Sequence, residues 1–320
     1  MMDYTKKIRR LVGVDVVLGL VLVSGILARG SDKAAALGER RELLKDPAAV
    51  HSIRVGAEET FSLSKAAGGW VLDSGAAGLP ADAERVAAFL DALASVDRLE
   101  QVASSADSKA SLGLTGTETV SLELTGSDGT VLLSLNCGAY APSGSRVYLA
   151  FPGSDASYSA PAGFASYLKA GRKRWLDLRA FPGQVQVADI EEIRASGSIV
   201  LADGSVRSLS YTLRRSGGGW EGGTGVADPA TVDAMARSLV SIKGDDWFTD
   251  GRVLGEPDAV IELSLGNSDT ITLSLYRMAS LYDLADDSYL AVSSERVLPL
   301  VVSAWTVADT FKDAQALAGS

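Results

Sequence analysis

The strongest hydrophobic pattern in the chain lies near its start. Apolar residues dominate Leu11–Ala28, a run of 18 residues, and four cations between residues 6 and 10 precede it. A helix of this length spans about 27 Å at ~1.5 Å per residue, close to the ~30 Å hydrocarbon core of a bilayer. The run therefore predicts a transmembrane helix. Asp15 interrupts it near the charged end, where it can lie at the interface or pair with Arg9 or Arg10, and a contact with a partner membrane helix is the alternative.

The same segment can also be compared with a cleaved signal. Val16–Ala28 alone has the length of a signal-peptide core, and Val23-Ser-Gly25 and Ala34-Ala-Ala36 are imperfect cleavage sites. The full run is long for a signal, so an uncleaved anchor is favoured. Residues 29–43 also carry four cations, but the N-terminal cluster is denser and long following domains cross largely regardless of charge. We expect a single-pass protein of the bacterial inner membrane, N-terminus cytoplasmic and bulk extracytoplasmic.

Beyond the anchor, the chain repeats itself. The blocks Phe61–Trp70 and Tyr211–Trp220 match at an offset of 150 residues, each ending in Gly-Gly-Trp. Further blocks follow in the same order, namely Pro80–Leu90 with Pro229–Leu239 (offset 149), Leu112-Gly113 with Leu254-Gly255, Val120–Leu135 with Val260–Leu275 (offset 140), and Tyr148 with Tyr289 (offset 141). Insertions fall in stretches rich in Gly, Ser and Asp, where loops tolerate them. The order predicts a duplicated unit.

Each unit combines alternating and helical patterns. Strands are expected at Ser52–Val55 and Phe61–Lys65 in the first unit and at Glu192–Ala195 and Tyr211–Arg215 in the second. Apolar residues at helical spacing then predict an amphipathic helix, at Val86, Phe89, Leu90 and Leu93 and again at Val232, Met235, Leu239 and Ile242. Asp228-Pro229 is a typical helix start.

A strand meander and a closing helix complete the pattern. Alternation predicts strands at Thr119–Leu124, Thr130–Leu135 and Val147–Phe151, with hairpin turns at Gly126–Gly129 and Gly266–Asp269, and closing helices at Ala162–Lys169 and Leu298–Asp313. The second unit has a longer front hairpin around Leu201–Gly204. We expect α+β units with one helix covering each antiparallel meander. The expected segments are a tail (1–10), the membrane helix (11–28), a linker (29–47), units at 48–180 and 181–315, and a tail (316–320).

Composition and charge exclude several classes of function. The chain has 30 basic and 40 acidic residues, which give a net charge of −10. A surface that binds nucleic acid is therefore not expected, because such a surface concentrates positive charge. One Cys and one His exclude intrachain disulfides, cysteine metal clusters and any motif that needs two histidines. We expect no cofactor and no resident metal.

Individual candidates for chemistry are weak. His51 precedes the first strand, and Cys137 ends an apolar strand as a small buried filler. Ser62–Lys65 matches Ser-x-x-Lys, but in a strand positions three apart face opposite ways. We therefore expect no catalytic residue and no enzyme.

Clusters of glycine and charge also have ordinary explanations. The Gly-rich stretch Gly217–Gly225 lacks the ending of a phosphate loop, and the acidic groups at Asp245–Asp250 and Asp283–Asp287 lack the spacing of an EF-hand, although they leave a calcium contact open. The basic group Lys169, Arg172, Lys173 and Arg174 is expected to be solvated, with anionic lipid or polymer as the alternative contact. Trp70 and Trp220 occupy matching places, which favours packing.

The order of these features resembles the domain-of-unknown-function 4340 family. The features are Trp70, Pro80-Ala81-Asp82, Leu112-Gly113, the strand Leu133–Gly138, Tyr148 and the tail Lys173–Arg179, covering about residues 48–315 twice over. Two departures stand out, because Cys137 replaces an apolar residue before Gly138 and Thr231 replaces the Asp of Pro-Ala-Asp in the second unit.

The resemblance implies a role but no chemistry. The family often occurs beside gliding-motility-type ABC transporter components, and it has no established catalytic residues. A non-enzymatic, membrane-anchored accessory or scaffold protein with protein partners is the leading expectation. A binding module for a small ligand or envelope polysaccharide is the alternative, and a carboxylate-based hydrolase is a weaker one.

Overall fold

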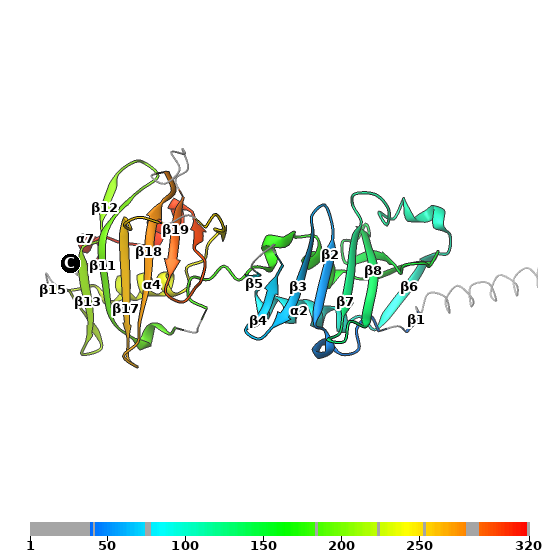
Figure 1. The fold of residues 1–320 in the computed structure, drawn as a ribbon, viewed down its shortest axis with the longest axis horizontal. Coiled ribbons are helices and arrows are strands. Elements are labelled where there is room, and N and C mark those ends of the chain that lie inside the picture. Colours follow the sequence, from blue (N-terminus) through cyan, green and yellow to red (C-terminus); the bar gives the residue numbers. More distant parts are fainter. Residues whose placement is uncertain are drawn as a thin grey trace, which may run out of the picture. The chain divides into compact units, whose positions relative to one another are not determined.

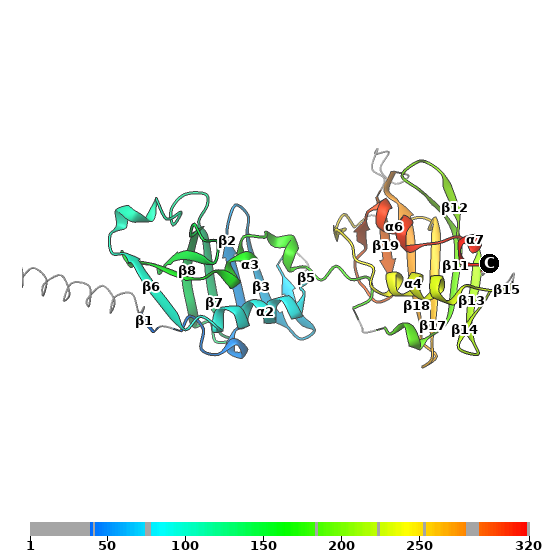
Figure 2. The same ribbon diagram turned by 180° about the vertical axis from the view of Figure 1, so that it is seen from behind.

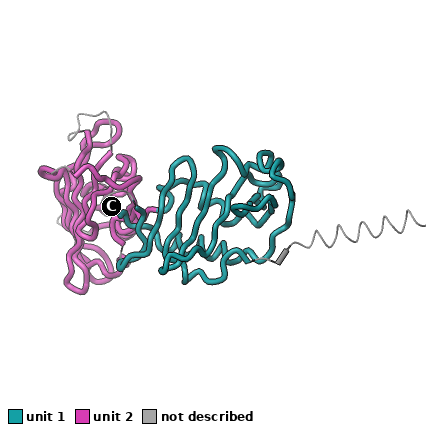
Figure 3. Tube along the Cα trace, turned by 45° about the vertical axis from the view of Figure 1, so that its right-hand side comes forward, with its two compact units in different colours: residues 1–175 teal, residues 176–320 magenta. Residues whose placement is uncertain are grey.

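The computed structural model describes residues 39–40, 42–73, 78–182, 185–222, 225–251, 254–279 and 288–318. They form two compact units, one ending at Trp175 and one beginning at Leu176 (Figure 3). The expected membrane helix Leu11–Ala28 and Asp15 lie outside the described residues. Among the described helices, none combines the length and the apolar character that crossing a bilayer needs.

The first unit is one antiparallel sheet with helices on a single face (Figures 1 and 2). Its ten strands lie in the order β1-β6-β10-β9-β8-β7-β2-β3-β4-β5. They are β1 (Glu39–Arg40), β2 (Ser52–Gly56), β3 (Thr60–Ala66), β4 (Gly69–Leu72), β5 (Leu79–Pro80), β6 (Arg98–Ala103), β7 (Val120–Thr125), β8 (Val131–Tyr140), β9 (Arg146–Ala150) and β10 (Ser157–Pro161). Helix α2 (Ala83–Ala94) lies on the covered face, with the closing 3-10 turn Ala162–Phe164, α3 (Ala165–Leu168) and a further 3-10 turn, Arg172–Trp175.

The second unit has the same strand order. Its strands are β11 (Ile190–Val200), β12 (Val206–Ser208), β13 (Tyr211–Ser216), β14 (Gly219–Gly222), β15 (Gly225–Val226), β16 (Asp246–Trp247), β17 (Ala259–Leu265), β18 (Thr270–Arg277), β19 (Tyr289–Ser293) and β20 (Leu300–Val302). The path β16-β20-β19-β18-β17-β11-β13-β14-β15 corresponds strand by strand to β6-β10-β9-β8-β7-β2-β3-β4-β5, and β12 adds a hairpin to β11. Helices α4 (Pro229–Val240), α6 (Ala304–Thr310) and α7 (Ala314–Leu317) cover one face.

Alternation in the strands explains why one face is covered. Ile53 and Val55 are fully buried and pair with Leu124 and Leu122, while the intervening Arg54 is exposed. An antiparallel sheet with one buried face gives this period of two. The expected meander strands and the hairpin turns at Gly126–Gly129 and Gly266–Asp269 are confirmed, as is the sheet-rich α+β class.

The amphipathic helices lie where the sequence predicts them. Helix α2 buries Val86, Phe89, Leu90 and Leu93, and α4 buries Val232, Met235, Ala236 and Leu239. Ile242 is buried but follows the end of α4. The predicted cap at Asp228 is confirmed, because its carboxylate accepts the N–H of Thr231 at 3.1 Å.

The structure corrects the pairing of the two helices. Asp82 caps α2 as Asp228 caps α4, each accepting the N–H three residues later at 3.1 Å. The helices therefore correspond at an offset of 146 residues, and the structural counterpart of Asp82 is Asp228 and not Thr231. Pro80 lies in the edge strand β5, whereas Pro229 is the first residue of α4. Proline is tolerated both in an edge strand and at the first position of a helix. Alignment of the two Pro-Ala pairs therefore matched positions that are not structurally equivalent.

The strand alignment is also out by one residue. The offset of 140 matches buried Leu122 with half-exposed Glu262, whereas the buried positions of β17 are Ala259, Ile261 and Leu263. The matched tyrosines also differ in the face of their own sheets on which they lie. Leu149 pairs with buried Cys137, so the preceding Tyr148 points to the open face, whereas Tyr289 is buried. A shift of one residue moves every side chain to the other face, so short sequence blocks cannot establish register.

One of the two closing elements differs from expectation. The turn and helix from Ala162 to Leu168 confirm the first closing helix, but Leu298–Asp313 contains strand β20 before α6. β20 pairs with β19 on one side and β16 on the other. The apolar residues of β20 are compatible with a helix or a strand, and pairing with the neighbouring strands makes the segment a strand.

A backbone hydrogen bond closes each unit at the start of its helix. The N–H of Asp82 donates to the carbonyl of Trp175 at 2.8 Å, and the N–H of Asp228 donates to the carbonyl of Leu317 at 3.0 Å. Trp175 and Leu317 are therefore equivalent, and the first unit closes before the expected boundary at residue 180. The tail Lys173–Arg179 is divided, since Trp175 packs in the first unit and Asp177 in the second.

Gly138 marks a close approach between a strand and the Leu112-Gly113 turn. The register of β8 against β9 shifts between Cys137 and Tyr140, and the N–H of Ala139 donates to the carbonyl of Leu112 at 2.9 Å. A Cβ at Gly138 would overlap that carbonyl oxygen. The Leu-Gly pair and Gly138 are thus parts of one contact.

We expect Gly138→Ala to lower the free energy of unfolding by about 2 kcal/mol, because the methyl group would push the Leu112 turn away from the strand. Gly163→Ala is the matched control, since a Cβ there meets no atom within 4 Å, and its effect should stay within ~0.5 kcal/mol. Urea unfolding followed by tryptophan fluorescence measures both. Equal stabilities of the two variants would contradict the contact.

A buried ion network holds the first residues of the second unit. Asp177 accepts hydrogen bonds from Arg179 at 2.8 Å and from Arg296 at 2.7 Å, and both Asp177 and Arg296 have side chains less than a tenth exposed. Burial alone would raise the pKa of Asp177, but the two guanidinium groups hold that pKa below its ordinary value. The guanidinium of Arg296 also donates to the carbonyl of Arg179 at 2.9 Å.

We expect Asp177→Asn to destabilise the second unit by about 3 kcal/mol at neutral pH, because the buried charge of Arg296 loses its partner. A carboxyl whose folded pKa is lowered contributes stability above its unfolded pKa, near 3.8, and loses it as the pH falls through the folded value. The difference from wild type should therefore shrink in acid. Urea unfolding at neutral and acid pH tests this, with exposed Glu256→Gln as control, and a constant difference would argue against the network.

Candidate functional site

The only histidine serves the sheet through its backbone. The N–H of His51 donates to the carbonyl of Thr125 at 2.8 Å, and its own carbonyl accepts the N–H of Lys65 at 2.9 Å. Within the described ranges, no three His, Cys, Asp or Glu side chains gather as a metal site would require. His51 is thus placed between two strands and outside any acidic cluster of the described chain.

Cys137 and the Ser-x-x-Lys motif lie in strands. Cys137 is fully buried in β8, between Val120 and Leu149, and burial raises the pKa of its thiol to about 11. Ser62 and Lys65 lie three apart in β3, whose alternating burial turns them to opposite faces. Neither geometry brings a nucleophile to a base.

Trp70 and Trp220 occupy equivalent positions. Trp70 is paired with Lys65 across β3 and β4, and Trp220 with Arg215 across β13 and β14. Trp220 is buried, donates its indole N–H to Asp233 at 2.8 Å, and lies 4.4 Å from the Arg215 guanidinium. These contacts are packing contacts. The glycines before Trp220 form the β13–β14 turn, where Gly217 and Gly218 have positive φ.

The charged clusters are largely engaged within the fold. Lys169 donates to the carbonyl of Gly138 at 2.6 Å and lies over the Tyr140 ring, and Arg172 pairs with Glu59 at 2.9 Å. Asp246 accepts the N–H of Trp247. The acidic group Asp283–Asp287 lies outside the described residues.

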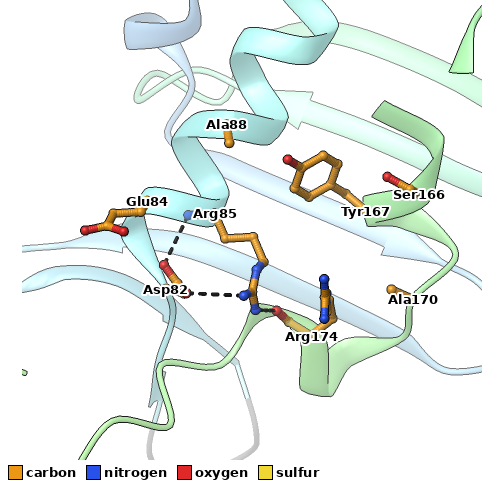
Figure 4. Close-up of a pocket in the computed structure, with 8 residues that line it drawn as sticks. All are labelled: Asp82, Glu84, Arg85, Ala88, Ser166, Tyr167, Ala170 and Arg174. Atoms are coloured by element: carbon orange, nitrogen blue, oxygen red, sulfur yellow. Dashed lines mark hydrogen bonds and ion pairs between the residues drawn. The ribbon is translucent and has the colours of Figure 1, made fainter. Parts of the chain in front are cut away.

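The structure reveals a groove that the sequence did not indicate. It lies between α2 and the closing segment of the first unit and has a volume of about 660 Å³ (Figure 4). Eight residues line it: Asp82, Glu84, Arg85, Ala88, Ser166, Tyr167, Ala170 and Arg174. Helical spacing could place Arg85 and Ala88 on one side of α2, but the approach of the closing segment is a tertiary contact without a local signal.

An aromatic cluster supports the groove. The Tyr167 ring lies 5.8 Å from Phe89 and 6.2 Å from Trp175, and Phe89 meets Trp175 edge to face at 5.1 Å. Phe89 and Trp175 are fully buried. Because these rings pack tightly, Tyr167 has little freedom to move.

The two walls of the groove are tied together. Arg85 donates to the backbone carbonyl of Arg174 and forms an ion pair with Asp82 at 3.6 Å. Together with the bond from Asp82 to Trp175, these contacts preform the groove. Among the described residues, no hydrogen bond or ion pair engages the guanidinium of Arg174, which lines the groove together with Tyr167 (Figure 4). The lining of the groove therefore includes both an available cation and an aromatic ring.

We expect Cys137 in the native protein to resist thiol reagents near pH 8, because burial keeps it protonated and inaccessible. The same thiol should react at once in denaturant. Labelling of the full chain with a colorimetric disulfide reagent measures both states. Rapid labelling of the native protein would contradict the buried position.

Comparison with known proteins places the chain in a family. Neither the curated proteins nor the solved structures provide a significant match. The family profile described as "Domain of unknown function (DUF4340)" matches residues 70–258, more than half of the chain. The match is one span, narrower than the expected 48–315. It runs from β4 to the residue before β17, across the boundary of the units. The chain therefore belongs to the DUF4340 family.

Proposed function

We propose that the chain is a non-enzymatic, membrane-anchored extracytoplasmic scaffold whose two units dock protein partners. The observation that carries this proposal is the shared strand order of the two sheets. A chain with two copies of one fold presents related surfaces twice, and a partner that engages both binds far more tightly than one that engages either.

The open sheet face of the second unit suits such docking. Glu192 accepts hydrogen bonds from Arg194 at 2.7 Å and from Arg214 at 2.6 Å, and Arg194 reaches Glu262 at 3.3 Å. These ion pairs cross β13, β11 and β17 on the face opposite the buried side chains. An ordered row of charges favours a partner with a complementary pattern.

The sequence supports the anchor and the partner in this proposal. Leu11–Ala28 would hold the chain in the bacterial inner membrane, with the N-terminus cytoplasmic. The family resemblance implies an association with gliding-motility-type ABC transporter components, so a permease or a related envelope protein is the proposed partner. The engagement of His51, Cys137 and Trp220 in the fold is consistent with a role without catalysis.

A second candidate function is a binding module for a small ligand or envelope polysaccharide. The preformed groove beside α2 favours it, since its size lies within the usual range of ligand pockets, ~300–1,000 Å³. A carboxylate-based hydrolase has less support, because Asp82 is already engaged by the helix cap and by Arg85.

We expect the tagged full chain, purified from gently solubilised membranes, to retain a membrane protein complex. A double variant, Leu20→Arg with Val23→Arg, places two cations within the apolar run and should release the chain from the membrane fraction. Mass spectrometry identifies the partners. Recovery of the wild type as a clean monomer would argue against the scaffold, and membrane retention of the double variant against the anchor.

A further inference from the structure

The groove of the first unit has a counterpart in the second. A groove of about 430 Å³ lies beside α4 and is lined by Ala230, Thr231, Ala234, Met235, Ser238, Asp309 and Lys312. At the offset of 146 residues established by the two caps, Arg85 corresponds to Thr231 and Phe89 to Met235. The fold thus forms a groove at the same place twice.

The side chains of the two grooves differ in a consistent way. The cation of the second groove, Lys312, already faces Asp309 at 3.9 Å, and no aromatic side chain lines that groove. In the first groove, Tyr167 packs against the buried rings of Phe89 and Trp175. The same groove contains Arg174, whose guanidinium has no partner among the described residues. Of these two grooves, only the first is lined by both an available cation and an aromatic ring.

The ends of the first groove carry opposite charges. Figure 4 shows Glu84 at the start of α2, on the far side from Tyr167 and Arg174. Asp82 and Arg85 neutralise each other, so the exposed carboxylate of Glu84 and the guanidinium of Arg174 remain for a ligand. A ligand that places a carboxylate at Arg174 and hydroxyl donors at Glu84 would match both ends of the groove.

We infer that the groove beside α2 binds a carboxylated sugar ring of the hexuronate type. A guanidinium matches a carboxylate as a two-pronged donor, which assigns the sugar's carboxylate to Arg174. The apolar face of a pyranose ring packs on an aromatic side chain, which assigns the ring to Tyr167. The sugar hydroxyls then donate to Glu84, an acceptor when ionised. The volume of about 660 Å³ accommodates one or two such rings.

This inference specifies the ligand of the second candidate function and does not depend on the anchor or on a partner complex. The binding site consists of packed parts of the fold, since Arg85 joins its two walls and Tyr167 packs against Phe89 and Trp175. Little ordering is therefore required on binding, which favours affinity.

The test is calorimetric titration of the detergent-solubilised full chain with tetragalacturonate and with its methyl ester, which keeps the sugar but removes the charge. The wild type should bind the acid at least tenfold more tightly than the ester. Arg174→Gln should weaken binding of the acid at least tenfold, and Tyr167→Leu should weaken both forms. Lys312→Gln, in the equivalent groove, should leave binding unchanged.

Three results would overturn the inference. If acid and ester bind equally and Tyr167→Leu abolishes both, the groove remains a binding site, but the assignment of a carboxylate to Arg174 is refuted. Binding insensitive to both variants would place the site elsewhere. No binding of either probe by wild type would refute the hexuronate ligand, but not a binding module for another small ligand or polysaccharide. Circular dichroism checks the variants, and since Arg174 is exposed, its replacement should preserve the fold.

Discussion

The backbone hydrogen bond that closes each unit is the constraint on which the rest of the structure depends. Each unit is a single antiparallel sheet with one apolar face, which a lone helix cannot cover. The N–H groups at the start of a helix have no partner within the helix. At the start of α2 and α4, the N–H of the capping aspartate instead binds the last segment of its unit, at 2.8 Å to Trp175 and 3.0 Å to Leu317. That bond ends one unit and brings the remaining cover onto the sheet.

The closing contact also creates the candidate site. Because the segment that ends at Trp175 returns to the start of α2, it leaves a groove along the helix, and the second unit repeats that geometry beside α4. The backbone therefore provides the groove and the side chains distinguish the copies. The grooves differ at few positions, and Thr231 and Met235 stand where the first unit has Arg85 and Phe89. The first groove is charged and aromatic, whereas the second is smaller and its lysine is already paired.

Local signals in the sequence predicted the local structure well. The cap at Asp228 and the buried faces of both helices follow from spacing and side-chain chemistry. Strand β10 was not expected, because Ser157–Pro161 has a polar composition, yet β6 and β9 pair with it on both sides and bury its serines. Register and the groove also escaped prediction, since both depend on which distant segments meet.

Residue-resolved amide hydrogen exchange of the full chain tests the repeated closing contact most directly. The amides of Asp82 and Asp228 lie at helix starts, where exchange is ordinarily fast, but here each is bound to the last segment of its unit. Both should exchange as slowly as the central strands of their own sheets. Exchange of either amide at the rate of exposed turns would contradict one fold closed twice in the same way.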